Sequence, residues 1–275
     1  MCTRVLFLCK TVSDMKKLFK LFSVFDIALW CVSVVTIILS FTLSPNRDYL
    51  TLTSSVIGVT ALMFIVKGHV AGQILTIIFA IFYGVVSFFF KYYGEMITYL
   101  GMSAPAAVMA TISWLRHPYK KSTHAQVEVG AMTVKKTIAL LAVTAVATVA
   151  FYFILRALDT TNLTVSTISV ATSVLAASLV FLRSPLYGLA YAANDVVLIV
   201  LWALATAENI AYLPMIICFS LFLILDLYGF VSWTKMRKNQ CGEALLQSEI
   251  DKPNGAENDT KPANKIADEH ADECQ

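Results

Sequence analysis

The chain has 275 residues, of which 58% are hydrophobic and 14% charged, and its mean hydropathy is +0.72. Soluble domains average about 45–50% apolar and about 25% charged residues, so the composition excludes a soluble enzyme, a nucleic-acid-binding protein and a small disulfide-stabilised secreted domain. The formal net charge of +3 is too small to indicate a partner of opposite charge. This is the composition of a membrane protein.

Eight apolar stretches follow one another along the chain, and a helix needs about 20 mostly apolar residues to cross a bilayer. Short segments rich in Pro, Gly, Asn or charge separate them, as the ends of membrane helices require. The stretches are too long and too rich in Leu, Val and Ala for the strands of a membrane barrel. We therefore predict an all-α membrane protein with eight transmembrane helices, at about 23–43, 49–66, 70–90, 95–115, 136–157, 164–182, 186–206 and 211–233.

The positive charges predict the orientation of the helices. With the N-terminus inside, the inner segments hold fifteen Lys and Arg residues and the outer loops hold three. The positive-inside rule then places both termini in the cytoplasm. Residues 1–20 are predicted as a cytoplasmic N-terminus, and residues 239–275, which are polar and contain half of the 18 acidic residues, as a disordered cytoplasmic tail.

The two halves of residues 21–238 carry weak matches in the same order. Ser113–Arg116 (Ser-Trp-Leu-Arg) ends the fourth stretch and Ser232–Lys235 (Ser-Trp-Thr-Lys) ends the eighth. Lys67, which precedes Gly72, corresponds to Arg183, which precedes Gly188. Repeats at about 49–118 and 164–238, joined by a linker helix at about 136–157, would have the same topology. Parallel repeats of this kind occur in transporters that bind substrate near the midplane. Trp114 and Trp233 are expected to be anchors at the inner interface.

Several residues occur in order along the two halves. They are Tyr93-Gly94-Glu95, Pro105 and Trp114 in the first half, and Arg183, Asn194-Asp195, Trp202, Tyr228-Gly229 and Trp233 in the second. Over about residues 50–238, these residues and their spacing resemble the PnuC family of vitamin B3 transporters. The resemblance implies a fold similar to SWEET sugar transporters, with two parallel three-helix bundles, a linker helix and here an extra N-terminal helix. It also implies uptake of nicotinamide riboside by facilitated diffusion, with trapping by a cytoplasmic kinase.

Ionisable groups inside a membrane are candidate sites, because each costs about 2.5–3.5 kcal/mol to insert. Asp195, beside Asn194, lies near the middle of the seventh stretch, Asp226 lies in the inner part of the eighth, and Glu95 lies near the outer end of the fourth. No Lys or Arg lies in the middle of any stretch. The carboxyl groups are therefore protonated and hydrogen-bonded, face a water-filled cavity, or receive a positively charged ligand.

Polar and aromatic residues recur at helical spacing in the seventh stretch, and a similar stripe runs along the third. Aromatic rings attract cations, and amides suit ribose hydroxyls. Packing between helices remains an alternative role for Asn194 and Asp195, a structural or gating role for Asp226, and a solvated helix start for Glu95. The predicted substrate-binding residues are Asn194, Asp195, Tyr191, Tyr187, Gln73, Thr76, Tyr83, Trp202, Glu95 and Asp226.

The substrate prediction has alternatives, because this chain departs from the family at one point. Relatives often carry tryptophans ahead of the seventh-helix Asn, where this chain has Tyr187 and Ala190. Thiamine, a deoxynucleoside or nicotinamide mononucleotide are therefore alternative substrates. Proton coupling through Asp195 and Asp226 is an alternative to facilitated diffusion.

An enzyme is not expected, because the four histidines, at positions 69, 117, 124 and 270, lie outside the apolar stretches and none of the common catalytic motifs is present. Neither a cofactor nor a metal is expected. The expected partners are a nucleoside and the lipid bilayer, and no nucleic acid. The sequence predicts a bacterial cell membrane as the location and leaves the oligomeric state open, a homo-oligomer included.

Overall fold

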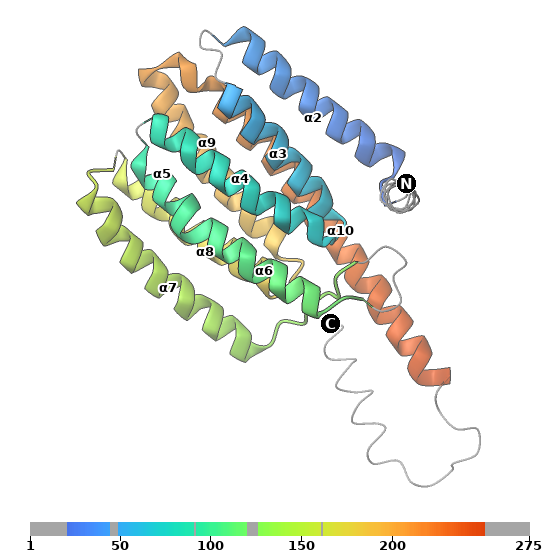
Figure 1. Ribbon diagram of the computed structural model, residues 1–275. Helices are drawn as coiled ribbons and strands as arrows, with labels where there is room; N and C mark the ends of the chain where they lie inside the picture. The colour runs from blue at the N-terminus through green and yellow to red at the C-terminus, as the bar shows by residue number, and fades with distance from the viewer. Residues whose placement is uncertain (1–20, 45–48, 91, 120–125, 161, 251–275) are drawn as a thin grey trace, which may run out of the picture.

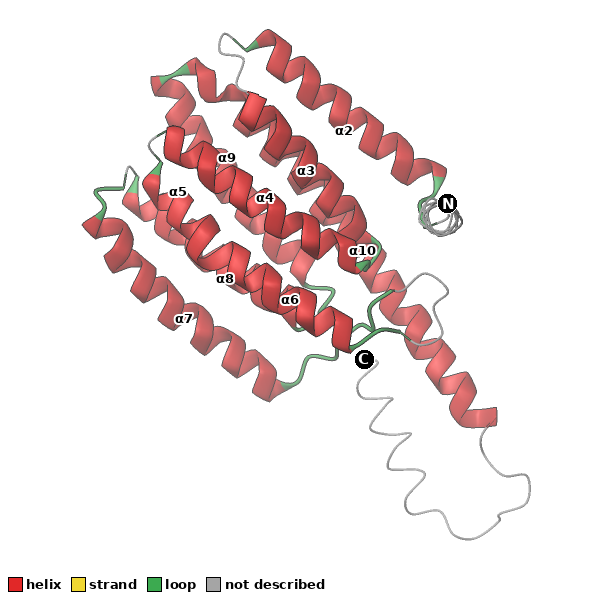
Figure 2. Ribbon diagram, viewed as in Figure 1, coloured by secondary structure: helices red, strands yellow, loops and turns green. Residues whose placement is uncertain are grey.

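The computed structural model describes residues 21–44, 49–90, 92–119, 126–160 and 162–250. Within this part, the chain forms helices joined by loops, of which the one between α6 and α7 is the longest (Figure 2). The predicted cytoplasmic segment at 1–20 and the last part of the predicted tail, 251–275, lie outside the described residues.

Eight helical spans within the described residues are long and apolar enough to cross a membrane, as predicted, and all but the last end within a few residues of the predicted bounds. The spans are α2 (Val24–Leu43), α3 (Tyr49–Val66), α4 (Val70–Phe89), α5 with η1 and α6 (together Tyr93–Arg116), α7 (Val134–Ala157), α8 (Leu163–Phe181), α9 (Tyr187–Glu208) and, after the short η2 (Ile210–Tyr212), α10 (Leu213–Ile250).

The spans form two three-helix bundles with one helix at each side (Figure 1). The first bundle contains α3, α4 and the α5–α6 span, and the second contains α8, α9 and α10; α3 and α6 of the first bundle pack against α10 and α8 of the second. Helix α7 packs against α8 and buries only Leu140 and Leu155, so most of its surface faces outward. Helix α2 packs against α3 and α10 at the opposite edge. These are the predicted linker and the predicted extra helix.

The fourth span contains a wide turn in its middle. Helix α5 (Tyr93–Thr98) leads into the π-helical turn η1 (Tyr99–Ser103), which leads into α6 (Ala104–Arg116). The amide of Ala104 donates to the carbonyl of Tyr99, five residues back. Pro105 follows directly and has no amide hydrogen to continue the regular pattern. Such π-bulges occur frequently at functional sites.

The end of α6 is attached to the end of α8 by a serine and a tryptophan. The indole Nε1 of Trp114 donates to the carbonyl oxygen of Val180 at 3.0 Å, and the hydroxyl of Ser113 donates to that of Phe181 at 2.9 Å. Both carbonyls belong to the last turn of α8, where a helix has too few amides of its own to bond every carbonyl. Side chains of the first repeat therefore supply the hydrogen-bond donors for the last carbonyls of a helix in the second repeat.

The middle of α10 is attached to the end of α3 by a similar pair of side chains. Trp233 Nε1 donates to the carbonyl of Ile65 at 2.8 Å, and Ser232 Oγ donates to that of Val66 at 2.9 Å. This reciprocal bonding is what a two-fold relation between parallel repeats requires, and the rings of Trp114 and Trp233 lie 5.3 Å apart beside its axis. The expectation that both tryptophans are interface anchors was wrong, because neither ring is exposed (0%).

A segment between the repeats joins equivalent corners in both of them. Gly68 and Arg183 follow α3 and α8, and both have left-handed backbones, with φ of 66° and 59°. The amide of Val127 donates to the carbonyl of Gly68 at 2.9 Å, and that of Gly130 donates to the carbonyl of Arg183 at 3.0 Å. The structure thus aligns Arg183 with Gly68. The predicted alignment with Lys67 was wrong by one residue.

Helix α10 continues beyond the bundle (Figure 1), so residues 239–250, predicted as the start of a disordered tail, are helical. Gln240 attaches this extension to the segment between the repeats. Its Oε1 accepts from the amide of Val129 at 2.9 Å, and its Nε2 donates to the carbonyl of Val127 at 3.1 Å. These bonds attach the polar end of α10 to another part of the fold. The composition of residues 239–250 does not reveal this contact.

A buried ion pair joins α2 to both repeats, and the sequence analysis did not predict it. Asp26 Oδ2 lies 2.6 Å from Lys67 Nζ, and the hydroxyl of Tyr228 donates to Asp26 Oδ1 at 2.6 Å. Ser23 and Asp26 also form a capping box at the start of α2. Asp26 has no exposed surface (0%), so it adds a fourth carboxyl group to the three predicted within the spans, Asp195, Asp226 and Glu95.

Candidate functional site

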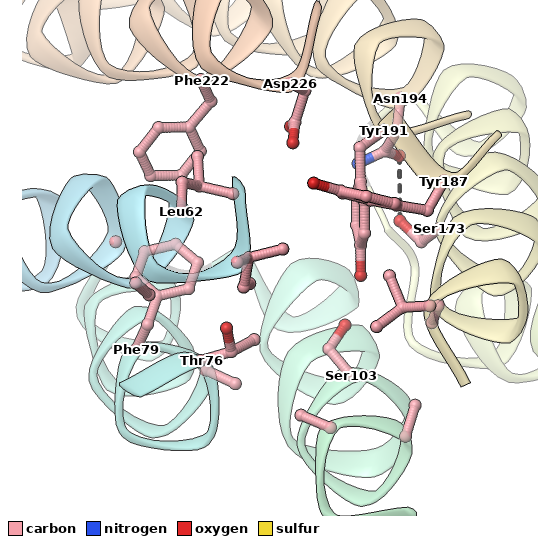
Figure 3. A pocket seen from close by; sticks show the side chains of 18 of the residues that line it. Leu62, Thr76, Phe79, Ser103, Ser173, Tyr187, Tyr191, Asn194, Phe222 and Asp226 are labelled. Carbon is pink, nitrogen blue, oxygen red and sulfur yellow. Dashed lines mark hydrogen bonds between the residues drawn. The ribbon is translucent and has the colours of Figure 1, made fainter. Parts of the chain in front are cut away.

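A cavity lies between the two bundles, near the middle of the spans (Figure 3). Its volume of about 80 Å³ is enough for several water molecules, since one needs roughly 10–15 Å³. Seven of the ten predicted site residues line it, namely Gln73, Thr76, Tyr187, Tyr191, Asn194, Asp195 and Asp226. Residues of α3, α4, η1, α6, α8 and α10 complete the wall, among them Gly58, Leu62, Phe79, Tyr99, Ser103, Ser173, Phe219 and Phe222.

Helix α9 presents the predicted polar stripe to the cavity. Asn194 and Asp195 are almost fully buried, and Tyr187 has no exposed surface. On the opposite face, Val196 and Val200 are about half exposed, at 50% and 47%. The helical period therefore separates a lipid-facing side of α9 from a polar side within a single span.

Two hydroxyl groups of α8 fix the orientation of the Asn194 amide. Thr172 Oγ1 and Ser173 Oγ both donate to Asn194 Oδ1, at 2.8 and 2.9 Å. Because the oxygen is held by these donors, the amide nitrogen lies on the side of Tyr191, as Figure 3 shows. Asn194 thus offers a hydrogen-bond donor to the cavity.

The carboxyl groups of Asp195 and Asp226 both lie at the cavity wall, one on α9 and one on α10. Asp195 Oδ2 and Asp226 Oδ1 are buried without a protein partner, and so are Gln73 Nε2 and the hydroxyl of Tyr187. Buried polar groups without partners are rare in folded proteins. These four atoms are therefore free to bond water or a ligand.

The cavity has no positively charged lining. Among the described residues that line it, none is Lys, Arg or His. Lys67, the cation at the end of α3, is engaged by Asp26. The charge available inside the cavity is therefore negative or neutral.

Aromatic side chains close the cavity on the side of the first repeat. The ring of Phe79 lies edge-to-face against Tyr99 at 5.9 Å and against Phe222 at 5.6 Å. Gly58 lies against the same rings, since a Cβ atom there would come within 2.4 Å of Phe222. The absence of a side chain on α3 at this point lets the two phenylalanines meet.

We expect Gly58→Leu to leave the spans intact and to reduce substrate binding at least tenfold. The new side chain must displace Phe79 or Phe222 toward the cavity, and overpacking costs about 1–3 kcal/mol. Binding titration of the purified variant measures the effect. Gly101→Leu is a matched control, because a Cβ atom at Gly101 meets only Ile97 of its own span, at 3.8 Å; equal losses in both variants would contradict the assignment.

The structure does not place the other three predicted residues on the cavity wall. Trp202 Nε1 donates to the hydroxyl of Tyr83 at 2.9 Å, and the Tyr83 ring packs against Tyr99 at 4.1 Å. Trp202 lies seven residues beyond Asp195, which is roughly 10 Å along a helix, so it shares the stripe but lies beyond the cavity. Glu95 is buried at the start of the fourth span, and its Oε2 has no partner.

Arg183, one of the residues that carry the family resemblance, also lies outside the cavity. It is at the corner between α8 and α9, where its Nη1 donates to the carbonyl of Glu128 at 3.4 Å. Burial lowers the pKa of its guanidinium, while the charge of Glu128 acts in the opposite direction. Its position is consistent with a role in the loops at the end of the bundles.

The sequence analysis missed several aromatic and small residues of the wall. Phe79 lies three residues after Thr76, so the helical period of α4 predicts that it shares the stripe. Tyr99 and Ser103 were hidden by the π-helical turn, which changes the period within the fourth span. Phe222 lies four residues before Asp226 on α10, so helical spacing from Asp226 could have identified it.

The fold and the cavity define a multi-pass membrane transporter built from two parallel repeats. The chain belongs to the family described as nicotinamide mononucleotide transporters, whose sequence model matches residues 48–235. This family consists of transporters and not of enzymes.

Relatives of known name and structure agree with this assignment. The nicotinamide riboside transporter PnuC of Neisseria mucosa is 27% identical over 206 residues, covering 74% of this chain and 78% of the relative. That of Haemophilus influenzae is 25% identical over 214 residues, covering 78% and 91%. The crystal structure of the vitamin B3 transporter PnuC superimposes with a TM-score of 0.70 at 25% identity, covering 80% of this chain and 94% of the other.

Proposed function

We propose that this chain carries nicotinamide riboside across the membrane by facilitated diffusion, and that a cytoplasmic kinase then traps the product. Membership of the family and the names of the relatives support a substrate of the vitamin B3 type. The lining of the cavity is the observation that favours one of these substrates over the others. It contains two carboxyl groups and, among the described residues, no cation.

The charge of the cavity favours the riboside over the mononucleotide. Nicotinamide riboside carries a positive charge on its pyridinium ring, which suits the carboxyl groups of Asp195 and Asp226 and the nearby tyrosine rings, since aromatic faces attract cations by about 0.5–2 kcal/mol. A phosphate group would need Lys, Arg or a helix N-terminus. Thiamine, which also carries a ring cation, is the second candidate on the same ground, whereas a deoxynucleoside is neutral.

The amide groups of the cavity suit the ribose and carboxamide of this substrate. Gln73 Nε2 has no protein partner, and the orientation of Asn194 is fixed by α8. A site with preoriented amides rejects ligands that leave them unpaired, because a buried unpaired donor costs about 1–3 kcal/mol. These groups support recognition of a hydroxylated sugar.

We propose that the protein lies in a bacterial cell membrane with both termini in the cytoplasm, where the kinase would act. The fifteen-to-three asymmetry of positive charge supports this orientation. In the structure, the segment between the repeats bonds Gly68, the neighbour of Lys67, and Arg183 at one end of the bundles. That end would face the cytoplasm.

We expect Asp195→Asn to weaken the binding of nicotinamide riboside by roughly 10- to 150-fold, which is what the loss of a charged hydrogen bond of about 1.5–3 kcal/mol produces. Asn194→Ala should weaken it about tenfold, through loss of one neutral bond. Isothermal titration of purified protein measures both. Val196→Ala on the lipid-facing side of α9 is the control, and unchanged binding in both cavity variants would overturn the site assignment.

A competition panel distinguishes the candidate substrates. Nicotinamide riboside, its mononucleotide, nicotinamide, thiamine and a deoxynucleoside compete with labelled uptake into proteoliposomes, and the riboside should compete best. Facilitated diffusion predicts that labelled substrate reaches, and does not exceed, the outside concentration. Accumulation above that level only under an imposed proton gradient would instead support the proton-coupled alternative.

A further inference from the structure

The carboxyl pair of Asp195 and Asp226 is the most unusual electrostatic feature of the cavity. Each group is nearly inaccessible, at 3% and 2% exposure, and each has one buried oxygen without a protein partner. Both line the same cavity, whose described lining contains no Lys, Arg or His. Two buried carboxyl groups at one site without a cation favour a state that holds a proton, because burying two like charges together costs more free energy than protonating one of them.

The groups that face the pair cannot replace that proton with a positive charge. From α9 these are Tyr187 and Tyr191, from η1 Tyr99, and from α10 Cys218. Phenols and thiols of this kind are neutral at neutral pH. The described lining residues of α3, α4, α6 and α8 add amide, hydroxyl and apolar groups only.

A buried site of this kind favours the same net charge before and after a ligand binds, because additional charge inside a membrane protein costs free energy. A cationic ring that binds beside the pair supplies the positive charge that the proton otherwise provides. The proton is then free to leave through the water of the cavity. The O–H bond of one carboxyl group breaks, its electron pair stays on the carboxylate oxygen, and the proton passes to solvent.

We propose that the empty cavity holds a proton on the Asp195–Asp226 pair and that a positively charged ring displaces this proton on binding. The proposal rests on the proposed function, since it takes nicotinamide riboside as the cation. It makes charge the specificity determinant of the cavity. The oxidised pyridinium nucleoside is selected, and its reduced dihydropyridine form, of similar shape and without charge, is discriminated against.

The test is isothermal titration of the full-length protein with nicotinamide riboside in buffers of different ionisation enthalpy. The expected result is release of about one proton per bound substrate and a Kd that falls by up to about tenfold per pH unit between about pH 5.5 and about 7.5. The neutral dihydro form should bind at least tenfold more weakly and release no proton.

The double variant Asp195→Asn/Asp226→Asn provides the matched comparison. It should release no proton and lose the preference for the cation over the neutral form, whereas Glu208→Gln, at an exposed carboxyl group on the same helix, should behave like the unaltered protein. If the double variant does not fold, the pH series of the unaltered protein decides alone. Binding of the riboside without proton release, or with a Kd independent of pH, overturns this proposal and leaves the proposed function intact. Absence of riboside binding at every pH overturns both.

Discussion

Replacing Trp233 by alanine is expected to destabilise the folded protein by about 3–5 kcal/mol, the usual cost of removing a buried tryptophan. The ring has no exposed surface, packs against Trp114 and Tyr187, and donates to the end of α3. Trp114→Ala should cost nearly the same, because the two residues are equivalent in the two repeats. Denaturant unfolding of the purified protein in detergent, followed by circular dichroism, measures both.

The indole hydrogen bond can be tested separately from the packing. Trp114→Phe and Trp233→Phe keep an aromatic ring but leave a helix-end carbonyl without its donor, so each should cost about 1–3 kcal/mol. Trp30→Phe is the control, because this half-buried tryptophan of α2 donates only to the hydroxyl of Thr60, at 3.1 Å. A severe effect at one of the paired tryptophans and a negligible effect at the other would contradict the two-fold equivalence.

The spans and the central part of the cavity were predictable because they depend on local patterns. Apolar length decides whether a helix crosses the membrane, and the period of α9 decides that Tyr187, Tyr191, Asn194 and Asp195 share a face. The repeat was predictable from its Ser-Trp pairs, which turned out to bond the two repeats to each other. In these cases one helix, or two matching segments, contains the whole signal.

The incorrect expectations depend on partners far away in the sequence. A tryptophan at the end of an apolar stretch is expected at the membrane interface unless another helix end packs against it. The partner of Trp233 is Ile65, which is 168 residues away, so the sequence near Trp233 does not reveal this contact. Trp202 shares the predicted face of α9 but lies beyond the cavity, because a helical period predicts direction and not distance along the axis. The helical extension of α10 depends on Gln240 finding the backbone of Val127 and Val129.

Asp26 was missed for the same reason, and its replacement should have the second largest effect. Removing one partner of a buried ion pair costs about 3–5 kcal/mol, and Asp26→Asn should lie near 3 kcal/mol, because Lys67 is 16% exposed and water compensates part of its charge. The Tyr228 hydroxyl also loses a charged acceptor. The same unfolding measurement in detergent gives the cost.

A double-mutant cycle separates the ion pair from local effects at either residue. Lys67→Met in the unaltered protein leaves the buried Asp26 carboxylate with only neutral hydrogen-bond donors, Tyr228 and Ser23. In the Asp26→Asn background, the same change removes a cation that already lacks its charged partner. The two losses should therefore differ by about 1–3 kcal/mol, the coupling typical of groups in one network. Lys136→Met, at a lysine whose bond is to the carbonyl of Ala131, should be nearly neutral. Additive losses at Asp26 and Lys67 would mean that the pair does not fasten α2 to the two bundles.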